Sequence, residues 1–153
     1  MANRDLLLKI LDEAYGRKAW HGTNLRGSLR GVPPETADWR PAPGRHNIRE
    51  LTVHCAYWKY TVRRRLTGEK RGTFARKGSN WLPPSPSWED DVRLLGAEHR
   101  ALRSAIANAS EQQLAKHERL IFGVAAHDAY HTGQIQLIKR LRGRGGRRGR
   151  RSL

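Results

Sequence analysis

Apolar positions recur at three- and four-residue steps in four stretches of the chain, which is the spacing of an amphipathic helix. The first stretch covers residues 4–30. The second begins after Asn47, where Glu50 completes the pattern of a capping box, and the third begins after Ser87. The last long helix contains AAHDAYHTGQIQLIKR. No strand-like alternation separates these stretches, so the sequence predicts an all-α fold, a four-helix bundle.

Glycines and prolines mark the expected helix ends. Gly16, Gly22 and Gly27 weaken the first helix, which we expect to be kinked or broken. The connection 68–86, between the second and third helices, is long for a small domain. At about 3.3 Å per residue it can span a bundle's length, so these two helices can run parallel in an up-down-down-up order. We expect the bundle to occupy residues 1–142.

Two histidines interrupt the apolar stripe of the last helix. That stripe consists of Leu120, Val124, His127, His131, Ile135 and Ile138. Residues four apart lie one turn from each other on the same helix face. A buried imidazole without a partner costs roughly 1 to 3 kcal/mol, and a divalent metal would satisfy both His127 and His131. The pattern therefore predicts a metal site.

His54 is the expected third ligand, because it lies at the flank of the second helix's stripe, one turn from Leu51 and Trp58. Three imidazoles from two helices leave coordination positions open, which is typical of reactive metal sites. Such a ligand set suits Zn, Ni, Fe, Co or Cu and does not choose among them.

The remaining polar residues have more ordinary interpretations. For His21 and His99 we expect a position in the core or a contact with one of the residues that bind the metal. Cys55 is expected to be a buried small hydrophobe rather than a nucleophile. Asp128 could orient a ligand, act as a base, or serve a surface or interhelical role. His46 and His117 are expected to be solvated. Trp58, Tyr130 and Gln134 are expected to be packing residues or pocket walls.

Charge adds a second candidate activity. The net charge is +16, and residues 140–153 contribute seven arginines and no acid. Glycines at 143, 145, 146 and 149 should prevent a packed helix there, so we expect residues 143–153 to form a disordered tail. Such a tail is either a solvated extension or an arm that binds RNA or DNA without sequence preference.

Composition also excludes several classes of protein. The single cysteine, Cys55, rules out an intrachain disulfide and a cysteine-rich zinc module, and it agrees with a reducing cytoplasm. The first twenty residues contain Asp5, Asp12 and Glu13 and do not resemble a signal peptide. No run of eighteen apolar residues occurs, so we expect a cytoplasmic protein with no membrane partner.

The segments NIRELTVHCAYWKYTVRRRLTG, GSNW, EHRAL and GVAAHDAYHTGQIQLIKR, with AWHGTNLRGSL and WRPAPG, resemble the DinB-like superfamily of damage-inducible and thiol-transferase proteins. The resemblance covers nearly all of the chain up to Arg142. It implies an up-down-down-up four-helix bundle, a divalent metal held by His54, His127 and His131, and often a homodimer. It also implies transfer of a low-molecular-weight thiol to an electrophilic substrate, or hydrolysis.

Two functional classes remain open at this point. One is a metal-dependent enzyme that acts on a small molecule. The other is a non-catalytic metal-binding module that associates with nucleic acid through its tail. A catalytic site predicts an accessible pocket beside the three histidines, whereas a structural site predicts a closed one.

Overall fold

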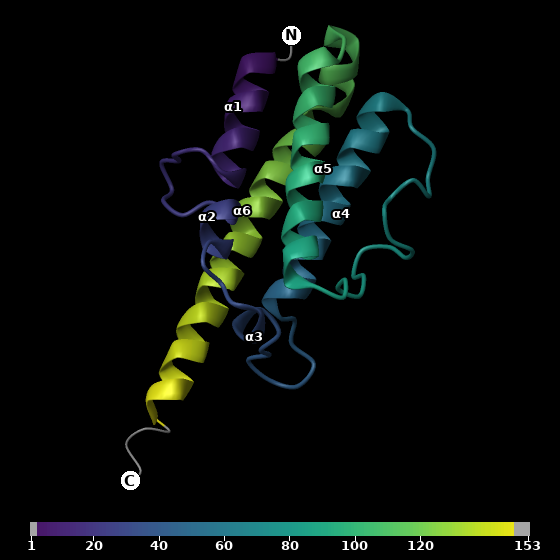
Figure 1. Cartoon of the computed structure of the whole chain (residues 1–153). Coiled ribbons are helices and arrows are strands. Elements are labelled where there is room, and N and C mark those ends of the chain that lie inside the picture. Colours follow the sequence, from purple (N-terminus) through teal and green to yellow (C-terminus); the bar gives the residue numbers. More distant parts are fainter. Residues whose placement is uncertain (1–2, 149–153) are drawn as a thin grey trace.

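The computed structural model describes residues 3–148, with side chains described as far as Gly143 (Figure 1). It contains six helices and, within these residues, no strand. The all-α class is therefore confirmed. The helices are α1 (Arg4–Tyr15), α2 (Leu25–Leu29), α3 (Pro34–Ala37), α4 (Ile48–Thr67), α5 (Trp88–Asn108) and α6 (Glu111–Arg148).

The four longer helices pack side by side. α4 contacts both α5 and α6, and α1 contacts the same two helices from the other side. In Figure 1, α4 and α5 run in the same direction and are joined by the long crossover loop, whereas α1 and α6 run the opposite way. None of the described helices is both long enough and apolar enough to cross a membrane.

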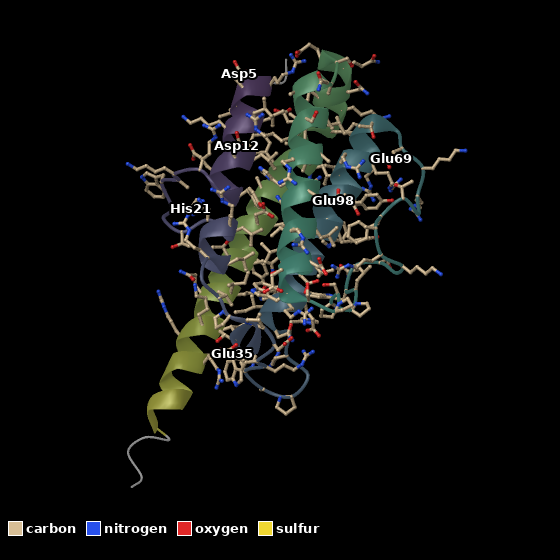
Figure 2. All side chains as sticks on the ribbon, in the orientation of Figure 1. Asp5, Asp12, His21, Glu35, Glu69 and Glu98 are labelled. Atoms are coloured by element: carbon tan, nitrogen blue, oxygen red, sulfur yellow. The ribbon has the colours of Figure 1, made fainter. Side chains whose placement is uncertain are left out.

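The first predicted helix is broken, as its glycines indicated. α1 ends at Tyr15, the short α2 starts at Leu25, and Gly22 in the connection has a φ of 98°, which favours glycine. His21 lies in this connection and is exposed, away from the bundle (Figure 2). The expectation that His21 lies in the core or contacts a metal ligand was therefore wrong, because the continuous helix that would have turned it inward does not form.

Local signals fix both ends of α4. The side chain of Asn47 accepts from the backbone N–H of Glu50, and the Glu50 carboxylate accepts from the Asn47 N–H, so the predicted capping box is present. Gly68 ends the helix in a left-handed conformation with a φ of 76°. Arg49, in the first turn, is buried and lies 2.7 Å from Asp91 of α5. This ion pair fixes the starts of the two helices against each other.

α6 is longer than the sequence suggested. It continues to Arg148, through Gly143, Gly145 and Gly146. Each glycine costs only about 1 kcal/mol relative to alanine, which a helix already formed can sustain. The last described side chains, from Leu141 on, are exposed. The disorder expected for residues 143–153 stays a prediction, and residues 149–153 lie outside the described part.

Buried apolar side chains form two clusters along the bundle. One, around Leu7, Leu11, Leu102 and Ile106, joins α1 and α5 with α4 and α6. The other, around Ile48, Leu51 and Ile135, joins α2, α3 and the start of α4 with α6. The predicted stripe of α6 faces this interior, since Val124, His131, Ile135 and Ile138 are all buried. His54 of α4 therefore meets His127 and His131 of α6 in the interface between the two helices.

Candidate metal centre

The Nε2 atoms of three histidines converge between α4 and α6. His127 Nε2 lies 3.1 Å from His54 Nε2 and 3.0 Å from His131 Nε2. A metal bound at 2.0–2.1 Å holds neighbouring nitrogens about 2.8 Å to 3.4 Å apart, in octahedral or tetrahedral geometry. The predicted residues are thus brought together at a spacing that fits a metal ion.

The opposite ring nitrogens of two of these histidines face oxygen acceptors. His54 Nδ1 lies 3.0 Å from the carbonyl oxygen of Asn80, and His131 Nδ1 lies 2.6 Å from Oε1 of Gln134. An oxygen acceptor requires the proton on Nδ1, which leaves the lone pair on Nε2. The lone pairs of His54 and His131 therefore point toward His127. A proton on His127 Nε2 can donate well to only one of these lone pairs, whereas a cation between the rings can accept both.

Burial keeps the three rings neutral. It lowers the pKa of His54 to about 4 and that of His127 to about 3, and it also lowers the pKa of His131. Neutral imidazole is the form that binds metals. His127 Nδ1 is buried and has no hydrogen-bond partner among the described residues, so this ring is held by packing and by its two neighbours.

The crossover loop supplies one wall of the site. The Trp81 ring stacks on His54, with ring centroids 3.8 Å apart, and also on His46, at 3.6 Å. Asn80 has a φ of 60°, and its side-chain oxygen accepts from Trp58 Nε1 at 3.1 Å. Sequence reasoning missed the roles of Asn80 and Trp81. The only signal was the GSNW segment, which contributed to the resemblance.

Comparison with protein families agrees with this geometry. A family model described as the DinB superfamily matches residues 18–135, which include all three histidines. The chain belongs to the DinB superfamily. Comparisons with curated proteins and with solved structures gave no match.

A second group in this DinB superfamily chain is a poorer candidate for metal binding. Ligand atoms of Cys55, His127 and Asp128 also lie close together. Burial raises the pKa of the Cys55 thiol, however, and a protonated thiol is a weak ligand. Asp128 is paired with Lys59. The three histidines are therefore the better donor set, and Cys55 is the buried small residue that we expected.

His99 and His46 of the DinB superfamily chain are not among the three converging histidines. His99 is buried between α1 and α5, where it stacks on Tyr15 at 3.7 Å and lies 3.6 Å from Asp12. It is thus a core histidine, one of its expected roles. His46 is exposed, as expected, although its ring is held by Trp81.

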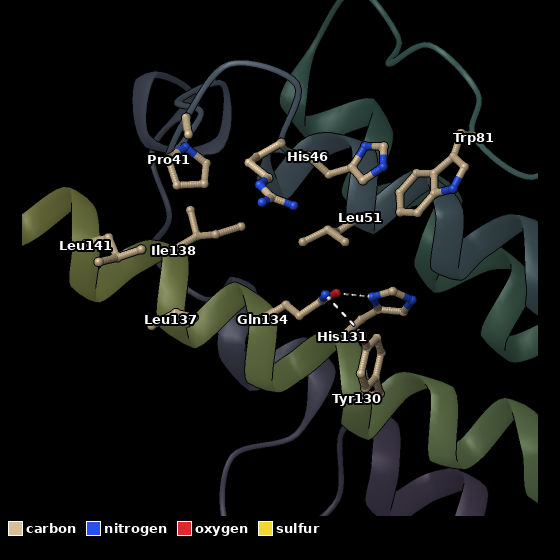
Figure 3. Close-up of a pocket in the computed structure, with 12 residues that line it drawn as sticks. Pro41, His46, Leu51, Trp81, Tyr130, His131, Gln134, Leu137, Ile138 and Leu141 are labelled. Atoms are coloured by element: carbon tan, nitrogen blue, oxygen red, sulfur yellow. Dashed lines mark hydrogen bonds between the residues drawn. The ribbon is translucent and has the colours of Figure 1, made fainter.

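Cavities adjoin the histidines on two sides. One, of about 420 Å³, is lined by His131, Trp81 and mainly apolar residues of α6, together with the predicted wall residues Tyr130 and Gln134 (Figure 3). The other, of about 290 Å³, is lined by His127 and Trp58. Both cavities open to solvent, so the histidine group is accessible rather than sealed in the core.

Proposed function

We propose that this DinB superfamily chain is a metal-dependent enzyme. One divalent transition metal is held by His54, His127 and His131 within an up-down-down-up four-helix bundle. The reaction is transfer of a low-molecular-weight thiol to an electrophilic small molecule, or hydrolysis. The observation that carries the proposal is the convergence of three Nε2 atoms between two open cavities.

A divalent metal at this position supplies Lewis acidity, which lowers the pKa of a thiol or of water and creates a nucleophile at neutral pH. The chain's own residues prepare the site. The Asn80 carbonyl and the Gln134 side chain hold the rings of His54 and His131 in the required tautomer. Trp81 covers His54 and limits access of water from the loop side.

The cavity beside His131 is the proposed place for the electrophile. Leu51, Ile138 and Leu137 give it an apolar lining, and Arg45 adds a positive charge that can pair with a substrate anion (Figure 3). Its volume of about 420 Å³ is in the range of small-molecule sites. The alternative, a non-catalytic metal module, needs no such cavity, and its support comes from the basic tail instead.

The first test is metal content. Untagged protein should contain close to one transition metal ion per chain by elemental mass spectrometry. His54→Ala, His127→Ala and His131→Ala should each lower this occupancy sharply. His46→Ala is the matched control and should not, because His46 contacts Trp81 and Glu50 but is not among the converging nitrogens. Full occupancy in all three ligand variants would contradict the assignment.

The second measurement separates enzyme from binding module. Metal-loaded protein should accelerate conjugation of an electrophile with at least one of several cellular thiols, or cleavage of an ester, and chelation should abolish that rate. Loaded protein that shows no metal-dependent turnover across these panels supports the binding module.

A further inference from the structure

A basic cavity lies on the outer side of α4, where the crossover loop folds back over the helix. Its volume is about 610 Å³. Five cationic residues line it, and no Asp or Glu does: Arg64, Arg65, Arg71, Arg76 and Lys77. None of the three converging histidines lines it either, so this cavity is separate from the metal centre.

Two of these five cations already have partners. Arg76 lies 2.9 Å from Asp91, and Arg64 donates to the backbone oxygen of Glu69. Arg65, Arg71 and Lys77 are exposed and form no ion pair with any described residue. Three cations are therefore available to a ligand.

The nearest loop acid does not neutralise them. Glu69, labelled in Figure 2 at the start of the loop, pairs with Arg63 and accepts from the Thr73 hydroxyl. The dipole of α4 favours Arg65 near its C-terminus. It does not account for Arg71 and Lys77, which the loop brings to the same cavity. Cations gathered around one cavity create a positive potential that attracts an anion.

Aromatic rings form the rest of the lining. Tyr57 and Trp58 are half-buried side chains of α4, and Phe74 of the loop packs edge-on against Tyr57 at 5.5 Å. Ring faces beside arginines are the combination that recognises a base together with its phosphates. The cavity volume also lies within the range of small-ligand sites.

We propose that this cavity binds a nucleoside phosphate. The phosphates pair with Arg65, Arg71 and Lys77, and the base packs against Tyr57 and Trp58. Trp58 and Arg65 also line the cavity beside His127, so the bound nucleotide lies next to the metal centre without contributing to it. The proposal does not depend on the metal or on the enzymatic activity.

The test is calorimetric titration of the full chain with ADP. We expect saturable binding that inorganic phosphate competes away and that adenosine does not reproduce. Arg71→Ala with Lys77→Ala should weaken ADP binding at least about tenfold, because charge-assisted contacts are lost. The control is Arg30→Ala with Lys70→Ala, which removes the same charge from two exposed residues outside the cavity. His127→Ala should retain the wild-type affinity for ADP, which separates this site from the metal centre.

Two outcomes overturn the proposal: no saturable binding of ADP, or an equal loss of affinity in the control pair, which would indicate attraction to overall charge alone. Titration with a short single-stranded oligothymidine then distinguishes a free nucleotide from a nucleic-acid strand as the ligand. If the oligothymidine binds more tightly than ADP, and Arg71→Ala with Lys77→Ala abolishes that binding, the ligand is a nucleic-acid strand. Binding no tighter than that of ADP identifies the free nucleotide.

Discussion

Lys59 of α4 and Asp128 of α6 form an ion pair in which neither side chain is exposed to solvent. Asp128 directly follows His127, so the pair fixes α6 against α4 one residue from the metal centre. Lys59 Nζ also lies 5.3 Å from the centroid of the Tyr15 ring, which links α1 to the pair. Burial raises the pKa of Asp128, and the Lys59 charge opposes that rise. The Asp128 carboxylate therefore depends on Lys59 to remain charged.

Removing one partner should be far more costly than removing both. Lys59→Met leaves the Asp128 carboxylate buried alone, and we expect a loss of about 3–5 kcal/mol in the free energy of unfolding. Lys59→Met with Asp128→Leu should recover most of this loss, since apolar side chains of similar volume then pack together. Urea unfolding measures both changes. Arg93→Met, which breaks an exposed pair with Asp90, should cost little. A Lys59→Met loss no larger than that of Arg93→Met would contradict this prediction.

Gln134 should determine metal affinity without touching the metal. Its Oε1 accepts from His131 Nδ1, so Gln134→Leu frees the ring to adopt the other tautomer. We expect metal affinity to fall about 10- to 100-fold, as for other partners of ligand histidines. Competition with a chelator of known affinity measures this change. Gln136→Leu on the same helix is the control, because Gln136 contacts Thr23 instead. Gln134→Glu keeps a side-chain oxygen that accepts from His131 Nδ1, so it should keep the metal affinity. Equal metal affinities in Gln134→Leu and Gln136→Leu would show that Gln134 does not fix the tautomer of His131.

His99 should make the protein less stable in acid. Burial lowers its pKa to about 3 in the folded protein, from 6.5 in the unfolded chain. The unfolded chain therefore binds a proton that the folded protein does not, so stability falls as pH drops from 6.5 toward 3. The groups around the ring are Asp12, Tyr15, Lys59, Arg26, Arg100 and Arg103.

His99→Gln should remove this contribution. With metal chelated in both proteins, the slope of unfolding free energy against pH should be flatter in the variant by up to about 1.4 kcal/mol per pH unit. Chemical unfolding across that pH range measures the slope. His21→Gln, a change at an exposed loop residue, should leave the curve parallel to wild type. Parallel curves for His99→Gln itself would show that His99 does not carry the effect.

The tail can be tested by truncation after Arg142. If the tail is a nucleic-acid arm, the intact protein binds DNA or RNA with little sequence preference, and the shortened protein shows a flatter dependence of log affinity on log salt. Each phosphate contact that is lost should reduce that slope by about 0.9 on duplex DNA. Metal content and thermal stability should not change, because the last described side chains are exposed. An unchanged slope and affinity would identify the tail as a solvated extension.

Periodicity and capping residues predicted the long helices well, because they act within a few positions of the chain. Asn47 with Glu50, and Gly68, mark the ends of α4 by local hydrogen bonds and backbone conformation. The four-residue spacing of His127 and His131 places both on one face of any helix that contains them. The main features of α4 and α6 and the three candidate metal ligands could therefore be predicted without a structure.

Only the tertiary structure decided what surrounds those histidines. Asn80 reaches His54 from 26 positions further along the chain, through a loop that has no periodic pattern. Lysine is usually exposed, so the sequence gives no reason to expect Lys59 in the core. Its complete burial depends on Asp128 of another helix, 69 positions away. Such contacts arise from the way helices and the crossover loop pack against one another. Hydrophobic spacing within a single helix contains no information about the partner that a polar side chain meets across the interface.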